Sequence, residues 1–435
     1  MRVFRKCRNR TLFAHITAVS IFAVCTIFSA TGKAAEYDLS SRSYLNLYER
    51  ETVAGQTEQF ASLYEYLSLD VWEIGERDLS FHLYGWGRLD LGDESRGGDT
   101  NGDLSSAYLQ YRDPWGNRHG KLGRFFLTEG TTAEMLDGLL FKGLLWHNFG
   151  ASVYGGAPVE NSIIAADEGD AIFGGRIYYV LPGVTEFGLG YFFEEGDFQG
   201  DNREEFGGDL WIRFARSLDL AGRAVYNIVT SDFAKHRLTL RLVPVHTVDL
   251  VVGTEEYQYK DLFQKSLHSA FLPPTVNPDD KVQSLFAKLD WQTSEKLSLQ
   301  AGVKSISHDE SDPGEATRGD VGLRLKLDGS VNLLGLSAAV QTADLSENEY
   351  QTYRGWLMGS VNRFSYSLDA LTYLYEEKID GEDTTYQVVG SAGFRFSPKF
   401  AISGDVRYTQ SPRFDEDLAV LLRADLSLDS SGGGN

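Results

Sequence analysis

The sequence contains little cysteine and little proline, and each shortage excludes a class of structure. Its two cysteines, Cys7 and Cys25, both lie in the first 34 residues. Without that segment, the chain can form no disulfide, thiolate metal site or covalent haem attachment. Only 10 prolines occur in 435 residues. Because proline interrupts the hydrogen bonding of strands, this scarcity leaves room for many long ones.

Positive charge is scarce as well. The chain has 41 Lys and Arg residues against 62 Asp and Glu residues, which gives a formal net charge of −21. Six of the basic residues and none of the acidic ones fall within residues 1–34, so removal of that segment takes the net charge to −27. Because phosphate groups repel such a chain, nucleic acid is excluded as an expected partner.

A long apolar run occurs only near the start of the chain, from Leu12 to Phe28, and five basic residues precede it. This pattern predicts a cleaved secretory signal peptide over residues 1–34, with the cleavage site open between residues 32 and 35. An uncleaved helical anchor and a lipoprotein modified at Cys25 are the alternatives. No later run approaches the length of a spanning helix, so any membrane crossing by the rest of the chain has to use strands.

The stretch from Asp78 to Asp93 alternates apolar and polar side chains throughout. Leucine, phenylalanine and glycine occupy its odd positions from Leu79 to Leu91, whereas the even positions from Ser80 to Asp90 are polar or aromatic. A period of two indicates a strand with two different faces. The stretch is also long enough for a tilted strand to cross a bilayer. An aliphatic face opposite a polar and aromatic one suits a barrel wall between lipid and a wet lumen.

The same pattern repeats along the chain in about twenty-two segments, the signature of a transmembrane barrel. Clear examples are residues 62–72, 206–216, 236–243, 318–327 and 417–428. The sequence therefore predicts an all-β fold, a closed antiparallel transmembrane β-barrel of about 22 strands. The strands would fall roughly within residues 37–428 of one domain spanning residues 35–435. A soluble β-sandwich or β-propeller is the alternative fold.

The connections between segments alternate in length, which is a second and independent signal. Long, acidic, glycine-rich connections, such as residues 92–103 and 194–205, alternate with short ones, such as residues 181–184 and 361–364. Outer-membrane barrels place short turns in the periplasm and long loops outside. The sequence thus predicts a barrel in the outer membrane of a Gram-negative cell, with both termini in the periplasm.

One region, Arg124 to Pro158, departs from the alternation. It predicts a short helix from Thr131 to Leu136, with a threonine as N-cap. We expect a loop over Thr128 to Asp137 that folds inward and narrows the lumen, or else a plain extracellular turn. The connection from Leu262 to Lys281 is more apolar than a solvated loop requires, so it is a second candidate for a plug or a lid.

If the polar face of each alternating segment points into the barrel, a set of charged residues lines the lumen. Placing these charges in the lumen avoids the cost of exposing them to lipid, which is roughly 2–4 kcal/mol for a basic residue near the midplane. They either set ion selectivity as charged rings or pair across neighbouring strands and solubilise the wall. The predicted lumen-lining residues are Arg88, Arg112, Arg124, Arg176, Arg213, Arg223, Arg241, Arg324, Asp90, Asp209 and Asp320.

Motifs for catalysis or cofactor binding are absent from the sequence. It has no HExxH, no G-x-S-x-G and no phosphate-binding P-loop. His82 with a neighbouring serine is the best available catalytic pair. The acidic loop from Asp93 to Asp103 has carboxylates suited to calcium but lacks the full EF-hand pattern. We therefore expect no enzyme activity, no metal site and no cofactor.

Four motifs carry a resemblance to a known group of proteins. They are GWGRLDLGD at residues 85–93, LGRFFLTEG at 122–130, LDG at 136–138 and FGASVYGGAPVE at 149–160. In these motifs the chain resembles uncharacterised porin-like outer-membrane barrels of anaerobic, metal-reducing bacteria, over most of its first 160 residues. The resemblance implies an outer-membrane location and a porin-like role, and it transfers no catalytic residue.

Two functions follow from these observations. The first is a channel for passive diffusion of small hydrophilic solutes or ions, with outer-membrane lipid around it. The alternative is a barrel that sheathes a periplasmic multihaem cytochrome in an electron-transfer conduit, a role implied by the resemblance and by the width of about 22 strands. Inner-face aromatic residues suit a protein partner, the sliding of sugars or simple packing, and they are Tyr64, Tyr66, Tyr84, Trp86, Tyr108 and Trp211. The solute and the oligomeric state stay open.

Overall fold

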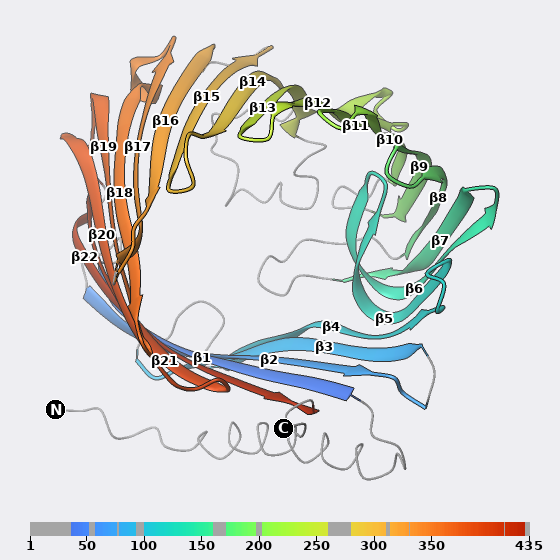
Figure 1. The fold of residues 1–435 in the computed structure, drawn as a ribbon, viewed down its shortest axis with the longest axis horizontal. Helices are drawn as coiled ribbons and strands as arrows, with labels where there is room; N and C mark the ends of the chain where they lie inside the picture. Colours follow the sequence, from blue (N-terminus) through green and yellow to red (C-terminus); the bar gives the residue numbers. More distant parts are fainter. Residues whose placement is uncertain are drawn as a thin grey trace.

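The computed structural model describes residues 36–51, 57–75, 78–92, 100–159, 171–196, 202–259, 280–309, 314–329, 331–412 and 414–430. Within them, 22 strands form one antiparallel sheet in which each strand pairs with the next in sequence and the first pairs with the last. Figure 1 shows these strands arranged as a ring. The predicted closed, antiparallel 22-stranded barrel is thereby confirmed. The predicted signal peptide lies outside the described residues, as does nearly all of the segment from Leu262 to Lys281.

The strands are long enough to account for most of the described chain. Their bounds are β1 (Glu36–Glu51), β2 (Thr57–Trp72), β3 (Leu79–Asp90), β4 (Thr100–Arg112), β5 (Arg118–Glu129), β6 (Thr132–Trp146), β7 (Phe149–Pro158), β8 (Ala171–Leu181), β9 (Thr185–Glu195), β10 (Arg203–Ala215), β11 (Leu218–Asn227), β12 (Asp232–Val245), β13 (Val248–Gln258), β14 (Lys281–Gln292), β15 (Leu297–His308), β16 (Ala316–Lys326), β17 (Val331–Ala343), β18 (Tyr350–Val361), β19 (Phe364–Ile379), β20 (Glu382–Ser397), β21 (Phe400–Ser411) and β22 (Phe414–Asp429). A short 3₁₀ turn, η1 (Ser346–Asn348), precedes β18. In the described part of the chain, no helix is long and apolar enough to cross a membrane.

The register of strand pairs explains why the alternation in sequence becomes two different faces. Directly opposite residues of neighbouring strands point to the same side of a sheet. In β2 and β3, for example, Tyr66 lies opposite Trp86, and Leu69 lies opposite Leu83. Polar and aromatic residues therefore line up with one another from strand to strand, and aliphatic residues do the same on the other side.

Three of the tight turns between strands are not predicted by the alternation of apolar and polar residues. Gly130 and Thr131 join β5 to β6, His147 and Asn148 join β6 to β7, and residues 228–231 join β11 to β12. His147 and Asn148 have φ values of 43° and 69°, as a type I′ hairpin turn requires. The third turn contains no glycine or proline. Its backbone is held by Asn227, whose Oδ1 accepts from the Val229 and Thr230 amides at 3.0 and 3.2 Å.

The helix predicted from Thr131 to Leu136 is wrong, because those residues begin β6. Gly130, with φ at 60°, occupies the first central position of the turn, where a type II′ hairpin needs a positive φ. Glu129 and Thr132 pair directly across the turn, and the pairing continues to Arg118 and Gly143. The residues after Gly130 therefore extend a hairpin.

The apolar face of the barrel has a polar interruption on β1 and β2. Glu65 accepts hydrogen bonds at 2.5 Å from the hydroxyl groups of Ser41 and Ser43. These three residues share the face of Leu63 and Leu67, which flank Glu65 along β2. The expectation of an aliphatic face throughout is therefore wrong at this position. Two serine hydroxyls supply the hydrogen bonds that the carboxylate would otherwise take from water.

Candidate functional site

The predicted lumen residues, except Arg124, lie on one face of the sheet. Following the register from β2 around to β16 places Arg88, Asp90, Arg112, Arg176, Asp209, Arg213, Arg223, Arg241, Asp320 and Arg324 on the same side. A role for these residues in contacting a solute stays a prediction.

The β5–β6 hairpin identifies that side as the inner face. Figure 1 shows the hairpin curving into the ring of strands. Its tip contacts the wall at β8 and β10, since a Cβ placed on Gly130 would come within 2.9 Å of Arg176 Cδ and 2.7 Å of Asp209 Oδ1. The opposite face carries large apolar side chains that are 50–66% exposed, among them Leu122, Leu139, Ile177, Leu285 and Val321.

Arg124 lies on the other face of the sheet from this set. It is directly opposite Ala107 on β4 and Asp137 on β6, and it shares the side of Leu122. Its guanidinium donates two hydrogen bonds to the Asp137 carboxylate, at 2.8 and 2.7 Å, and one to the Leu104 carbonyl at 3.0 Å. The register therefore separates Arg124 from the inner residues, and its partner satisfies its charge locally.

Most inner charges that form ion pairs do so with a neighbouring strand. Arg213 Nε lies 2.8 Å from Asp219 Oδ1, Arg241 Nε lies 2.9 Å from Asp249 Oδ1, and Arg354 Nε lies 3.0 Å from Asp369 Oδ1. Within the described residues, no acidic group lies within 4.0 Å of Arg112 or Arg223. The wall thus presents alternating charges that largely compensate one another.

The half of the β5–β6 hairpin that is nearer its turn leaves the barrel wall. β5 pairs with β4 only as far as Arg124, and β6 pairs with β7 only from Leu136 onward, whereas β5 and β6 stay paired to the turn. At the start of this departure, Gly123 has φ at 124°, and a Cβ there would lie 2.3 Å from the Ala107 carbonyl oxygen. Glycine is therefore required where the hairpin bends inward.

An apolar core forms where the hairpin folds back onto the wall. Inward residues of the hairpin pack against inward residues of β6 to β9, and all of them are at most 5% exposed. The members are Phe125, Leu127, Leu136, Leu140, Tyr154, Ile172 and Phe192. Burial of this many large side chains is the main force that holds the hairpin inside the barrel. The predicted inward segment from Thr128 to Asp137 is therefore an inward hairpin of strand structure.

Buried polar contacts fix the tip of the hairpin on the wall. Glu129, 5% exposed, accepts hydrogen bonds from Lys142 Nζ at 3.1 Å and from Ser152 Oγ at 2.9 Å. The hydroxyl groups of Thr132 and Tyr154 lie 3.1 Å apart. Because these groups are shielded from water, each would be costly to leave without its partner.

Two buried arginines extend these contacts to β10. Arg176, 4% exposed, donates to Asp209 Oδ1 and Glu186 Oε1, both at 3.0 Å, beside the hairpin tip. Arg203 connects the hairpin to the wall directly, because its Nη1 lies 2.7 Å from Glu134 Oε1 on β6. Charge pairs held in such a protected place resist rearrangement, since separating them leaves a buried charge uncompensated.

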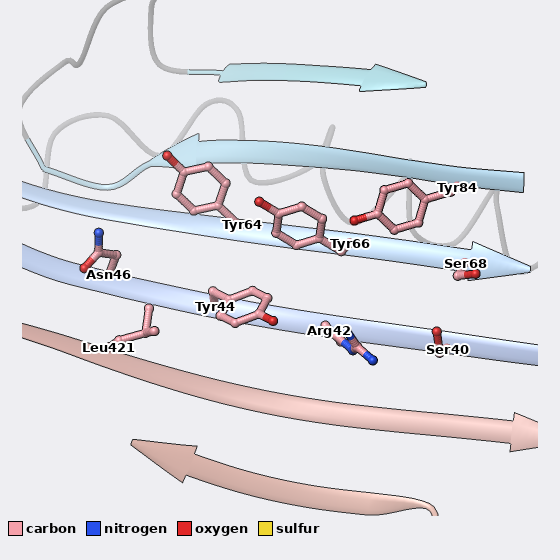
Figure 2. A pocket seen from close by; sticks show the side chains of 9 residues that line it. All are labelled: Ser40, Arg42, Tyr44, Asn46, Tyr64, Tyr66, Ser68, Tyr84 and Leu421. Carbon is pink, nitrogen blue, oxygen red and sulfur yellow. The ribbon is translucent and has the colours of Figure 1, made fainter. Parts of the chain in front are cut away.

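Aromatic residues gather on the inner face of β1, β2 and β3. Figure 2 shows the rings of Tyr44, Tyr64, Tyr66 and Tyr84 projecting from these strands on one side of the sheet. Ring centroids lie 5.5 Å apart for Tyr44 and Tyr66, and 6.4 Å apart for Tyr66 and Tyr84. Trp86 joins them, 6.4 Å from Tyr64. We call these five residues the aromatic strip.

The aromatic strip borders a hollow of about 460 Å³ in the wall. The four tyrosines line it together with the polar side chains of Ser40, Arg42, Asn46 and Ser68, and with Leu421. Arg42 lies 3.5 Å from the carboxylate of Asp425 on β22, which also pairs with Arg423 at 2.9 Å. The hollow thus combines ring faces with hydrogen-bonding groups of both kinds.

His82 lies in a hydrogen-bonded chain on the same inner face. Ser80 Oγ is 2.8 Å from His82 Nε2, and His82 Nδ1 is hydrogen-bonded to Asp70 Oδ1. This order of groups is that of a nucleophile, base and orienting carboxylate. However, Ser80 is only 7% exposed, and its backbone and that of His82 belong to paired strands. The chain of groups is accounted for as hydrogen bonding within the wall, where His82 also stacks on Tyr108 at 4.9 Å.

Metal ligation finds no support in the described residues, where no group of three or more His, Cys, Asp or Glu side chains is placed to hold an ion. The acidic loop from Asp93 to Asp103 lies mostly outside the described residues, since 93–99 are among those not described.

Comparison with known proteins shows the fold. No family model matches the chain, and no curated protein does. Among solved structures, the siderophore receptor PirA from Pseudomonas aeruginosa is similar, with a TM-score of 0.55 at 13% identity over 91% of this chain and 80% of that one. The translocation pore of the P pilus usher PapC is also similar, with a TM-score of 0.51 at 8% identity over 90% of this chain and 99% of that one. The resemblance to barrels of metal-reducing bacteria stays a prediction.

Proposed function

We propose that this protein is a porin-like channel of the Gram-negative outer membrane, through which small hydrophilic solutes or ions diffuse passively. The observation that carries the proposal is a closed barrel with exposed aliphatic side chains on one face and compensated charges on the other. The first face suits lipid, and the second suits a water-filled lumen. The two similar structures are named as a receptor and a translocation pore, which agrees with passage or uptake across a barrel.

The β5–β6 hairpin is the constriction of the proposed channel. Its inward side is buried in the apolar core and in the contacts of Glu129 and Thr132, whereas Phe126 on its other side is 53% exposed. A hairpin held in this way reduces the free cross-section without closing the barrel. Because buried charge pairs fix its tip, the constriction is a permanent part of the wall.

Conductance in planar bilayers tests this function. We expect steady single-channel currents from the purified full chain. Replacing residues 126–135 by Asn-Gly, a two-residue hairpin turn, joins the paired residues Phe125 and Leu136 directly. This variant should conduct more than the native protein, since the obstruction is gone and the wall pairing of β5 and β6 is kept.

A matched control shortens a hairpin that lies at the same end of the barrel. Replacing residues 377–383 by Asn-Gly trims the exposed tip between β19 and β20. Its conductance should equal that of the native protein. The channel proposal fails if neither the native protein nor the variant without the β5–β6 tip conducts, although both migrate as folded barrels.

The alternative function, a sheath for a multihaem cytochrome, draws its support from the 22 strands, which make a barrel wide enough to hold a protein. Against it, the β5–β6 hairpin already occupies part of the inner wall. Copurification separates the two functions. Under this alternative, a tagged barrel taken from its own host in mild detergent carries a haem-stained partner, whereas the channel proposal expects a colourless preparation.

A further inference from the structure

We propose that the aromatic strip is a binding track for neutral saccharides that enter the barrel. The inference rests on the proposed channel function, because the strip lies on the inner face. It goes further by assigning a class of solute and the residues that hold it. Three features of the site carry it: the spacing of the rings, the hollow beside them and the pairing of the nearby arginines with carboxylates.

The rings of the aromatic strip lie next to one another across three strands, with neighbouring centroids 5.5 to 6.4 Å apart. The planes of Tyr64 and Tyr66 differ by only 16° and those of Tyr66 and Tyr84 by 26°, whereas Tyr44 stands edge-on to Tyr66 at 88°. Tyr84 is 40% exposed, and the other rings are half-buried, so ring faces are open to the lumen. This spacing is on the scale of one sugar ring, whose flat C–H face is apolar and packs against an aromatic face.

Polar groups around the hollow match the rim of a sugar ring. Hydroxyl groups of a saccharide both donate and accept, and the hollow offers donors and acceptors together: Arg42, Asn46 and the hydroxyls of Ser40 and Ser68. A ligand site of this kind pairs an apolar surface with a few placed polar groups.

The arginines beside the aromatic strip all have carboxylate partners. Arg42 lies 3.5 Å from Asp425, and Arg423 Nε lies 2.9 Å from the same carboxylate. Arg88, next to Trp86 along the inner face of β3, lies 3.5 Å from Asp90. Because each of these arginines has a carboxylate partner, an ionic solute would have to compete with that partner, whereas a neutral solute with many hydroxyls can bind without separating the pairs. A purely aromatic solute would leave the polar rim of the hollow unsatisfied.

Two measurements on the full-length barrel test the saccharide track. Titration calorimetry in detergent measures binding of a linear glucose hexasaccharide, independently of any current. Single-channel recording measures transient block by the same sugar, with a polyethylene glycol of similar mass as the control for mere entry. We expect binding by calorimetry and concentration-dependent block by the sugar, with little block by the polymer.

Tyr66 is the residue to change, because its ring contacts those of Tyr44, Tyr64 and Tyr84. Tyr66→Ala should weaken sugar binding roughly five- to tenfold, the effect of re-exposing on the order of 50 Å² of apolar surface. Tyr66→Phe keeps the ring and should bind nearly as well as the native protein. Tyr257→Ala on β13, an inner-face tyrosine on the far side of the ring of strands, should leave binding unchanged.

The outcomes separate this inference from the channel proposal. A protein that conducts but shows neither sugar binding nor block overturns the track and leaves the channel standing. Equal loss of binding in Tyr66→Ala and Tyr257→Ala also overturns it, as does block by the polyethylene glycol that equals block by the sugar. If sugar binds in detergent and no current is found, the channel proposal fails while the site is retained.

Discussion

Gly130 is the residue that brings the hairpin tip closest to the wall. We expect Gly130→Ala to destabilise the barrel in two ways. Its φ of 60° strains any residue with a Cβ, at a cost of about 1–2 kcal/mol. The new methyl would also lie 2.7 Å from Asp209 Oδ1 and 2.9 Å from Arg176 Cδ, which adds about 1–3 kcal/mol of overpacking. Displacement of the tip should raise the single-channel conductance as well.

Gly183→Ala separates the two effects. Gly183 has φ at 76° in the turn between β8 and β9, and nothing lies within 4 Å of the position of its Cβ. The Gly183→Ala variant should therefore lose only the stability that backbone strain costs, and its conductance should be unchanged. The midpoint of urea unfolding in lipid vesicles measures the stability of both variants. Equal shifts of that midpoint would contradict the close contact of the tip with Arg176 and Asp209.

The sequence predicts the side of the sheet on which a charged residue lies wherever the residues around it alternate between apolar and polar. Asp209 and Arg213 flank Trp211 between aliphatic residues, so their side is unambiguous in the sequence. Arg124 stands in LGRFFLTEG, where Phe125 and Phe126 make both faces apolar. Local pattern could not decide its side, because one of those faces packs in the core inside the barrel and the other is exposed.

Among the elements, strands were predictable and tight turns were less so. The alternation identifies wall strands because lipid and water impose opposite demands on their two faces. The turn at His147 and Asn148 lacks glycine and proline, and the one at residues 228–231 relies on the side chain of Asn227. Neither has the composition that usually marks a turn. Such turns become visible only when the pairing of both flanking strands is known.

The β5–β6 hairpin is the element for which the sequence was most misleading. Its inner face carries Phe125, Leu127 and Leu136, where wall strands carry polar residues, because it packs against protein on that side. The loss of a clean period of two resembles a helix locally. The break in the alternation there left two predictions open, an inward segment and a plain extracellular turn, and the hairpin agrees with the first. The aromatic strip needed no such correction, since Tyr64, Tyr66, Tyr84 and Trp86 alternate regularly with apolar residues.

For the barrel, closure was predictable because an open sheet edge would leave backbone groups unpaired in lipid, and it is confirmed by the pairing of β1 with β22. The interior does not follow from local pattern, because contacts such as Arg203 with Glu134 join residues far apart in sequence. The compensation of charge around the wall is likewise a property of the assembled barrel. It depends on which carboxylate each arginine meets on the next strand, as Arg241 meets Asp249.

That compensation sets the expected ion selectivity of the channel. Inner arginines are largely paired with carboxylates, so no ring of one sign stands out to act as a strong filter. The chain as a whole is acidic, with a formal net charge of −21, which favours cations near the barrel mouths. We therefore expect weak cation selectivity, read from the reversal potential under a salt gradient. The preference should fade as salt rises, because the Debye length shrinks from about 10 Å at 0.1 M to about 3 Å at 1 M. Selectivity for anions, or a preference that persists at 1 M salt, would instead require an uncompensated charge at the narrowest point.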